Sequence, residues 1–380
     1  MTICTLTEQN TTSLYVQLIS VAELFTYLRR IKYFRVSKMS QEIPHWIPVV
    51  DLSPIRGEYG DITKEAYAKV VTQLGDAMSG IGFCYLVNHG IETAKVDHVY
   101  DVSRKFFAKP IQYKRKYLKV NPPENFHGYT EPGAELLNEA EKNSTELREV
   151  WDMWGWWGPN KSWEEACPDP VESPGFTEAF EALRPEMDNV SKKLFKLLAL
   201  YLQLDDEDFF IKRHRNLGDL SIPCQTQMRS MFYDVVSPDA KLPPGAIRCG
   251  EHSDWGSITL LFQDSVGGLE VQNVLGEWVQ ATPIPDSIIL NSGQLMELWT
   301  GGRLHAALHR VKIPESADSS GKLFQQPRQS FIYFVNPDGP ERVSPVLPIR
   351  EGKEELATKP TLVAFDHYKA RIVEATMLGY

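Results

Sequence analysis

Two side chains able to bind a metal stand two positions apart in the second half of the chain, His252 and Asp254. Residues i and i+2 of a β-strand point to the same face, so an imidazole and a carboxylate would project together from one strand end. An apolar run at 258–262 follows, and a Gly-Gly pair then separates it from a second apolar run at 269–271. This pattern predicts strand, turn and strand, with the His-x-Asp pair at the mouth of a β-barrel or jelly roll.

A His-x-Asp pair alone is weak evidence, because chance supplies one in many chains and a surface pair is the common case. A third ligand is available in segment 301–314, where His309 lies in an alternating, strand-like stretch. His305 stands four residues earlier and would share the same face, so it remains an alternative to His309 as the third ligand. Two His and one carboxylate leave positions open on an octahedral metal, as Fe(II) requires when it binds an organic ligand and O₂. A closed structural zinc site would need four protein ligands.

A possible carboxylate-binding pair follows in the same order along the chain. Arg328 and Ser330 alternate onto one face of a predicted strand. A guanidinium binds a carboxylate through two parallel hydrogen bonds, and a hydroxyl adds a third. Alone, Arg-x-Ser is typical of an ordinary surface strand, so its weight comes from its position after the His and Asp residues.

In this order and register the chain resembles the iron(II), 2-oxoglutarate-dependent dioxygenases of the isopenicillin N synthase-like group, from about residue 47 to the C-terminus. HSDWGSITLLFQD at 252–264 is similar to the family's H-T-D-x-G-x-x-T-L-L-x-Q-D, and RQSFIYFVNP at 328–337 to R-x-S-x-x-x-F-x-N-P. Segment 267–311 is similar to G-L-Q-V…W-V-x-V-x-P…N-x-G-D…L-H-R-V. The resemblance implies a mixed α/β protein with a mainly β core, a double-stranded β-helix (jelly roll) flanked by helices.

The same resemblance implies cofactors and residue roles. Fe(II) would be held by His252, Asp254 and His309, with 2-oxoglutarate and O₂ as cosubstrates. The far carboxylate of 2-oxoglutarate would meet Arg328 and Ser330, and Tyr233, which corresponds to the family's carboxylate-binding tyrosine in L-R-L-N-Y-Y-P. Among its departures from that motif, Met231 replaces Asn and Asp234 replaces Pro. The first change puts one polar contact to the cosubstrate in doubt.

Two other functions stay open at this point. One is an Fe(II) oxidase of the same fold that does not use 2-oxoglutarate, like isopenicillin N synthase and aminocyclopropane-carboxylate oxidase. There the Arg-x-Ser pair would serve a substrate or bicarbonate. The other is a non-catalytic binding protein on this scaffold, which the complete set of His, Asp, Arg and Ser residues disfavours.

Composition narrows the class of partner. The 380 residues are 42% hydrophobic, enough for a full core, and the net charge of −10 disfavours nucleic-acid and anionic-membrane binding. The five cysteines are scattered and odd in number, which favours a reducing compartment. No apolar run reaches bilayer-spanning length. We therefore expect a cytoplasmic, monomeric enzyme that acts on a small molecule.

The chain divides into five predicted regions: an N-terminal extension of unknown role at 1–45, an α/β dioxygenase region at 46–170, connecting helices at 171–221, the oxygenase jelly roll at 222–340, and a C-terminal segment and helix at 341–380. The extension is apolar and then basic. It is either an amphipathic presequence or an addition before a start at Met39.

Periodicity and breakers predict helices at 64–79, 96–110 and 180–201, and strands at 47–53, 82–91 and 225–234. Five Trp residues lie between 151 and 163. They form either an aromatic wall over the substrate channel or part of the core.

Overall fold

The structure is a computed structural model, and it describes residues 46–119, 127–135, 145–154, 163–235, 246–312 and 327–377. The predicted extension at 1–45 lies outside these residues. Within the described part of the chain, no helix has the length and the apolar composition that crossing a bilayer would need.

The largest sheet of the described residues has eight strands. Each pair of adjacent strands in it is antiparallel, except for the parallel pair β1–β2 at one edge. In spatial order its strands are β1 (Val49–Asp51), β2 (Phe83–Val87), β12 (Ile288–Ser292), β9 (Ile258–Gln263), β14 (Arg328–Val335), β6 (Gln227–Tyr233), β5 (Glu149–Trp154) and β3 (Gly128–Thr130).

A four-stranded sheet faces the large one, and its strands in order are β11 (Trp278–Gln280), β10 (Leu269–Gln272), β13 (His309–Val311) and β8 (Cys249–His252). One cluster of buried side chains joins the two sheets, with Leu261, Ile289 and Ile332 from the large sheet meeting Leu269 and Val311 from the small one. Two facing antiparallel sheets of this kind form the predicted jelly roll. Two short pairs complete the strands, β4 (Thr145–Glu146) with β7 (Ala246–Ile247) and β15 (Arg342–Val343) with β16 (Leu362–Val363).

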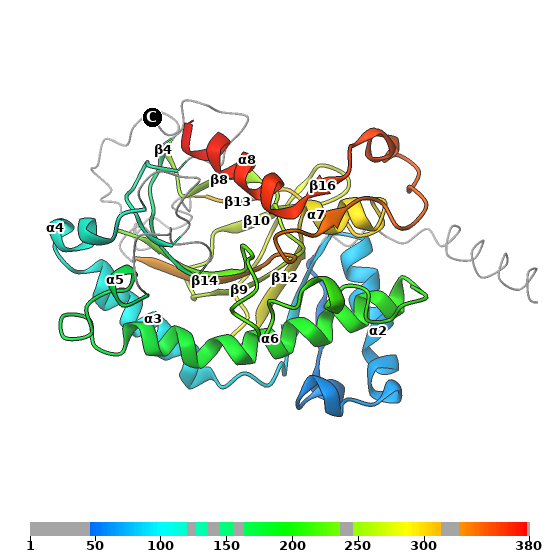
Figure 1. Ribbon diagram of the computed structural model, residues 1–380, viewed down its shortest axis with the longest axis horizontal. Helices are drawn as coiled ribbons and strands as arrows, with labels where there is room; N and C mark the ends of the chain where they lie inside the picture. Colours follow the sequence, from blue (N-terminus) through cyan, green and yellow to red (C-terminus); the bar gives the residue numbers. More distant parts are fainter. Residues whose placement is uncertain are drawn as a thin grey trace, which may run out of the picture. The chain divides into compact units, whose positions relative to one another are not determined.

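Three long helices cover the other face of the large sheet (Figure 1), namely α2 (Lys64–Ser79), α3 (Thr93–Phe107) and α6 (Phe176–Tyr201). The remaining helices are α4 (Ile111–Lys114), α5 (Trp163–Ala166), α7 (Gln294–Trp299) and α8 (Ala364–Met377). Short 3₁₀ turns occur at Ser53–Ile55, Tyr59–Asp61, Arg115–Tyr117, Ile211–Arg213 and Glu354–Thr358. The helices and the sheet enclose a second, larger apolar cluster.

The long helices agree with the periodicity of the sequence, with differences at their N-termini. The helix α2 has the predicted bounds, because Thr63 caps its first turn by accepting from the Ala66 N–H at 3.2 Å. The helices α3 and α6 begin three and four residues earlier than predicted. The helix α6 starts after Gly175, which has a φ of 76°, and it continues through Pro185.

The strands show the alternation that separates the two clusters. On β14, Ser330 and Ile332 face the space between the sheets, whereas Phe331 and Tyr333 pack toward the helices. The predicted glycine turn also forms, since Gly267 and Gly268 have φ values of 74° and 93°. The six inner strands of the large sheet therefore contribute to two cores at once, whereas the edge strands β1 and β3 contribute only to the core on the helix side.

The tryptophan-rich segment belongs to the helix side where it is described. The Trp151 side chain is fully buried and packs against the rings of Phe106 and Phe176, with ring centroids 5.0 and 5.2 Å away. Trp156 and Trp157 lie outside the described residues. For Trp151 the structure therefore supports core packing, and a different residue, Trp255, lines the cavity described next.

Candidate active site

A cavity of about 80 Å³ lies between the two sheets. Its walls come from alternate residues of β6, β9 and β14 and from the ends of β8 and β13. Single residues of β2, β10, β12 and α8 and the segment that follows β8 also line it. All six side chains singled out in the sequence line it: His252, Asp254, His309, Arg328, Ser330 and Tyr233. Residues far apart in sequence thus reach one enclosed space because the jelly roll places their strand ends together.

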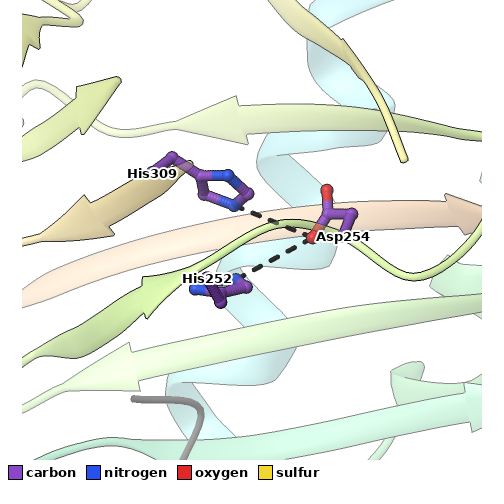
Figure 2. A group of neighbouring side chains, drawn as sticks. All are labelled: His252, Asp254 and His309. Atoms are coloured by element: carbon purple, nitrogen blue, oxygen red, sulfur yellow. Dashed lines mark ion pairs between the residues drawn. The ribbon is translucent and has the colours of Figure 1, made fainter. Parts of the chain in front are cut away.

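His252, Asp254 and His309 converge at one end of the cavity, as Figure 2 shows. His252 is the last residue of β8 and is paired across the sheet with His309, the first residue of β13. Asp254 lies two residues beyond the end of β8. Its Oδ1 is 3.8 Å from Nε2 of His252 and 3.7 Å from Nε2 of His309. One possible ligand atom from each residue lies within 4.8 Å of the others.

Backbone contacts orient both imidazoles. The Nδ1 of His252 is 2.7 Å from the Gly250 carbonyl oxygen, and the Nδ1 of His309 is 3.3 Å from that of Ala307. A carbonyl oxygen can only accept, so each Nδ1 carries the proton and each Nε2 keeps its lone pair. Both lone pairs are thereby available on the side where Asp254 lies.

The carboxylate of Asp254 is oriented by a neighbouring strand. Its Oδ2 accepts a hydrogen bond from the Nδ2 of Asn291, on β12, at 2.6 Å. This contact leaves Oδ1 facing the two imidazoles. Hydrogen bonds of this kind to a metal-binding carboxylate fix its direction and are part of a working metal site.

The protonation states suit a divalent cation. Burial lowers the pKa of His252, and burial together with the charge of His252 lowers that of His309 to about 4. Burial alone would raise the pKa of Asp254, but the two imidazoles and the Asn291 contact outweigh it and the pKa falls. At neutral pH the group is therefore two neutral imidazoles and one carboxylate. That donor set fits Fe(II) with open positions and provides too few ligands for a closed zinc site.

His305 does not join this group. Strand β13 begins only at His309, so the alternation that would have given the two histidines one face does not extend to His305. The Nδ1 of His305 lies 3.3 Å from a carboxylate oxygen of Glu297 instead. The Lys353 ammonium meets the same oxygen at 2.9 Å.

Arg328, Ser330 and Tyr233 form the wall at a second part of the cavity. Arg328 and Tyr233 are paired across β14 and β6, and all three side chains are buried. Arg328 donates from Nε to the Gly267 carbonyl at 2.8 Å and from Nη1 to Ser330 Oγ at 3.2 Å. The guanidinium lies 4.9 Å from the centre of the Tyr233 ring. No acidic side chain forms an ion pair with Arg328 among the described residues, so its charge is available to an anion.

Met231 occupies the position where the family motif has Asn, and it contacts Tyr233. The Tyr233 hydroxyl donates to the Met231 sulfur at 3.1 Å. A thioether is a weak acceptor, and burial raises the pKa of Tyr233 so that the phenol keeps its proton. The hydroxyl is therefore a donor that can exchange this partner for a stronger acceptor.

Four further cavity residues were not singled out from the sequence: Asn291, Trp255, Tyr368 and Arg229. Asn291 and Trp255 stand inside the quoted motifs, so their position next to the His-x-Asp pair was a signal. Tyr368 comes from α8, and its ring packs edge-on against Trp255 at 5.4 Å. Nothing in the sequence indicates that a C-terminal helix reaches the site.

Comparisons with known proteins identify the family of the chain. Residues 47–171 match the family described as the N-terminal region of non-haem dioxygenases in morphine synthesis. Residues 222–337 match the 2OG-Fe(II) oxygenase superfamily. A 2-oxoglutarate-dependent dioxygenase of Dothideomycetidae sp. is 30% identical over 307 residues, covering 77% of this chain and 87% of that protein. A homoarginine-6-hydroxylase of Oryza sativa subsp. japonica is 28% identical over 337 residues, covering 86% and 96%.

Solved structures show the same fold. The Neurospora crassa T7H in complex with alpha-KG has a TM-score of 0.69 and 24% identity, over 86% of this chain and 96% of that one. A 2OG-Fe(II) oxygenase family protein from Caulobacter crescentus has a TM-score of 0.67 and 24% identity, over 86% and 99%. The chain belongs to the iron(II)- and 2-oxoglutarate-dependent dioxygenases of the isopenicillin N synthase-like type, enzymes that use Fe(II), 2-oxoglutarate and O₂.

Proposed function

We propose that this dioxygenase oxidises a C–H bond of a small organic molecule, by hydroxylation, desaturation or ring closure, with His252, Asp254 and His309 as the Fe(II) ligands. The observation that carries the proposal is that this group lines the same enclosed cavity as Arg328, Ser330 and Tyr233. Bound Fe(II) would supply the reductive activation of O₂ that is coupled to decarboxylation of 2-oxoglutarate to succinate and CO₂.

The protein's part is to bind and orient. Arg328, Ser330 and Tyr233 hold the far carboxylate of 2-oxoglutarate, because a guanidinium and two hydroxyls match its acceptors. The side chains of His252, Asp254 and His309 are only 6–12% exposed, which limits access of water to the reacting atoms. Asn291 acts through Asp254 as a positioning residue.

The substrate wall suggests what kind of group lies beside the iron. Trp255, Phe334 and Tyr368 make this part of the cavity largely apolar. The Arg229 guanidinium also reaches the wall, but it is already paired with both oxygens of Asp152, at 2.7 and 2.8 Å. We therefore propose that the reacting part of the substrate is uncharged.

Cellular context is part of the same proposal. The six site residues come from one chain, so a monomer is sufficient. Cys84, Cys167 and Cys249 are buried free thiols, which suits the cytoplasm. The net charge of −10 argues against nucleic acid or an anionic membrane as a partner. We also propose that the chain divides into the five regions predicted from the sequence.

The test is 2-oxoglutarate-dependent succinate release from Fe(II)-loaded protein, screened across amino acids, flavonoids, terpenoids and peptides. Succinate should form in step with oxidised product for the true substrate. The Arg328→Lys variant keeps the charge but loses the two-pronged geometry, so its requirement for 2-oxoglutarate should rise about tenfold or more. Lost activity with an unchanged 2-oxoglutarate requirement would contradict this role for Arg328 and favour an oxidase that does not use 2-oxoglutarate.

A further inference from the structure

Arg248 is a buried cation that forms no ion pair with a carboxylate among the described residues. It lies between β7 and β8, and only 1% of its surface is exposed. Its Nε and Nη1 are buried and have no hydrogen-bond partner. A buried charged group without hydrogen bonds is costly, so such a group calls for an explanation.

Most of the other buried arginines differ from Arg248 in forming an ion pair with a carboxylate. Within the described residues three of them have carboxylate partners: Arg148 pairs with Glu146, Arg184 with Asp188, and Arg229 with Asp152. The two that form no ion pair with a carboxylate are Arg248 and Arg328.

These two arginines lie against the same side chain. The guanidinium carbons of Arg328 and Arg248 are 4.9 and 5.8 Å from the centre of the Tyr233 ring. Burial lowers the pKa of Arg248, and the charge of Arg328 lowers it further. Two positive charges therefore lie beside the Tyr233 ring, close enough to repel each other. Arg328 lines the cavity, whereas Arg248 is not among its lining residues.

One acidic group acts on Arg248 but does not neutralise both cations. Asp264 is close enough to raise the pKa of Arg248. Its carboxylate, however, accepts from the backbone N–H groups of Gln329, at 2.5 Å, and Val266, at 3.0 Å. Two cations against one occupied carboxylate leave an excess positive charge around the Tyr233 ring.

We propose that Arg248 supplies a second positive charge for the far carboxylate of 2-oxoglutarate, beside Arg328, and so makes the site selective for a 2-oxo dicarboxylate over a 2-oxo monocarboxylate. This rests on the proposed function, in which Arg328, Ser330 and Tyr233 bind that carboxylate. A second charge near a buried site strengthens binding even without direct contact, because screening by water is weak there. It also compensates for the thioether of Met231, which cannot donate a hydrogen bond as the family's Asn can.

The test compares two five-carbon acids that differ only at the far end, 2-oxoglutarate and 2-oxopentanoate. Their dissociation constants are measured without O₂ on Fe(II)-loaded protein, from the charge-transfer absorbance of the bound 2-oxo acid. The Arg248→Gln variant should weaken 2-oxoglutarate about tenfold and leave 2-oxopentanoate within about twofold. Arg248→Lys, which keeps the charge, should recover most of the loss.

A second readout separates binding from a purely structural role. An unpaired buried cation opposes folding, so Arg248→Gln should keep or raise the melting temperature of the metal-free protein. Arg213 provides the matched control, because it also lies over an aromatic ring, that of Phe209 at 3.6 Å, but is paired with Glu341. Arg213→Gln should leave the affinities for both acids unchanged.

The outcomes that overturn the inference are distinct. Equal weakening of both acids, no weakening of either, or a fall in the metal-free melting temperature would show that Arg248 is structural. A changed KM for the organic substrate with an unchanged 2-oxoglutarate affinity would assign Arg248 to the substrate instead. If the unaltered protein bound neither acid, the proposed function itself would fail, independently of Arg248.

Discussion

The two faces of the large sheet carry two cores of different character. The outer core, between the sheet and helices α2, α3 and α6, is apolar and rich in aromatic rings such as Phe106, Phe180 and Phe195. The inner core, between the two sheets, mixes aliphatic side chains with two imidazoles, one carboxylate and two guanidinium groups. The same strands build both, because alternate residues point to opposite faces.

The difference shows how the fold divides stability and chemistry. An apolar core is stabilised by burial and close packing, and it tolerates few polar atoms. Most charges in or beside the inner core are matched, as in the ion pairs of Asp152 with Arg229 and Lys119. The exceptions are Arg328 and Arg248, which form no ion pair with a carboxylate among the described residues, and Asp254, whose carboxylate faces two neutral imidazoles. Changes on the outer face should therefore cost stability, and changes on the inner face should cost ligand binding.

The largest effect is expected for His309→Ala on the inner face. Loss of one of three proposed ligands should reduce turnover at least about a thousandfold, about 4 kcal/mol of transition-state stabilisation. Iron binding is measured by metal analysis after desalting, and turnover by succinate release. The control His305→Ala should retain iron, because its ring lies against Glu297. Iron lost from His305→Ala and kept by His309→Ala would reverse the ligand assignment.

On the outer face, Phe331→Ala should lower the free energy of unfolding by about 3–4 kcal/mol. Phe331 is fully buried, with the Phe180 ring 5.9 Å away and the Phe262 ring 6.1 Å away. Denaturant melts measure this, and the Fe(II) affinity of the folded protein should stay unchanged. Phe334→Ala is the matched change on the inner face of the same strand. It should cost less stability because Phe334 is only partly buried. Equal losses would show that the two cores are not distinct.

Acidic pH should destabilise the outer core because His214 becomes protonated. This ring is fully buried between Phe210 and Ser257, and burial lowers its pKa to about 4. The unfolded chain takes up the proton near pH 6.5 and the folded protein only near pH 4. The free energy of unfolding should therefore fall as the pH drops through this window, by roughly 3 kcal/mol in all.

The His214→Gln variant tests this pH dependence. In this variant the free energy of unfolding should depend less steeply on pH between about pH 6 and 4.5. The slope should decrease by up to about 1.4 kcal/mol per pH unit, which corresponds to the uptake of one proton on unfolding. Urea melts at closely spaced pH values give the slope. A slope equal to that of the unaltered protein would assign the acid sensitivity to other groups, such as His367, whose pKa burial also lowers to about 4.

The smallest effect is expected for Asn291→Ala, which removes the hydrogen bond that orients Asp254. Loss of such a supporting interaction lowers metal affinity by roughly 10–100-fold. Competition with a chelator measures the affinity. The control Asn273→Ala removes an asparagine of similar burial in the turn before β11, where it bonds Glu277. It should cost stability and leave iron affinity unchanged, and a similar iron loss in both variants would contradict the role of Asn291.

The sequence alone was sufficient to single out six residues that the structure brings to one cavity. For five of them the signal is local, since side-chain type and spacing within a strand can be read directly from the chain. Tyr233 followed only from the resemblance to the family motif. The helix at 64–79 and the strands around 258–272 followed from periodicity for the same reason. Alternation did not settle the choice between His305 and His309, because it depends on where β13 begins.

Only the tertiary structure decided the remaining features of the site. Tyr368 reaches the cavity because α8 packs on Trp255, and Arg248 lies near Arg328 because β6 presents the Tyr233 ring to both. Asn291 orients Asp254 from a different strand. These relations join residues tens of positions apart, and they depend on strand order and helix docking. Such long-range geometry leaves no periodic signal in the sequence, so packing alone determines it.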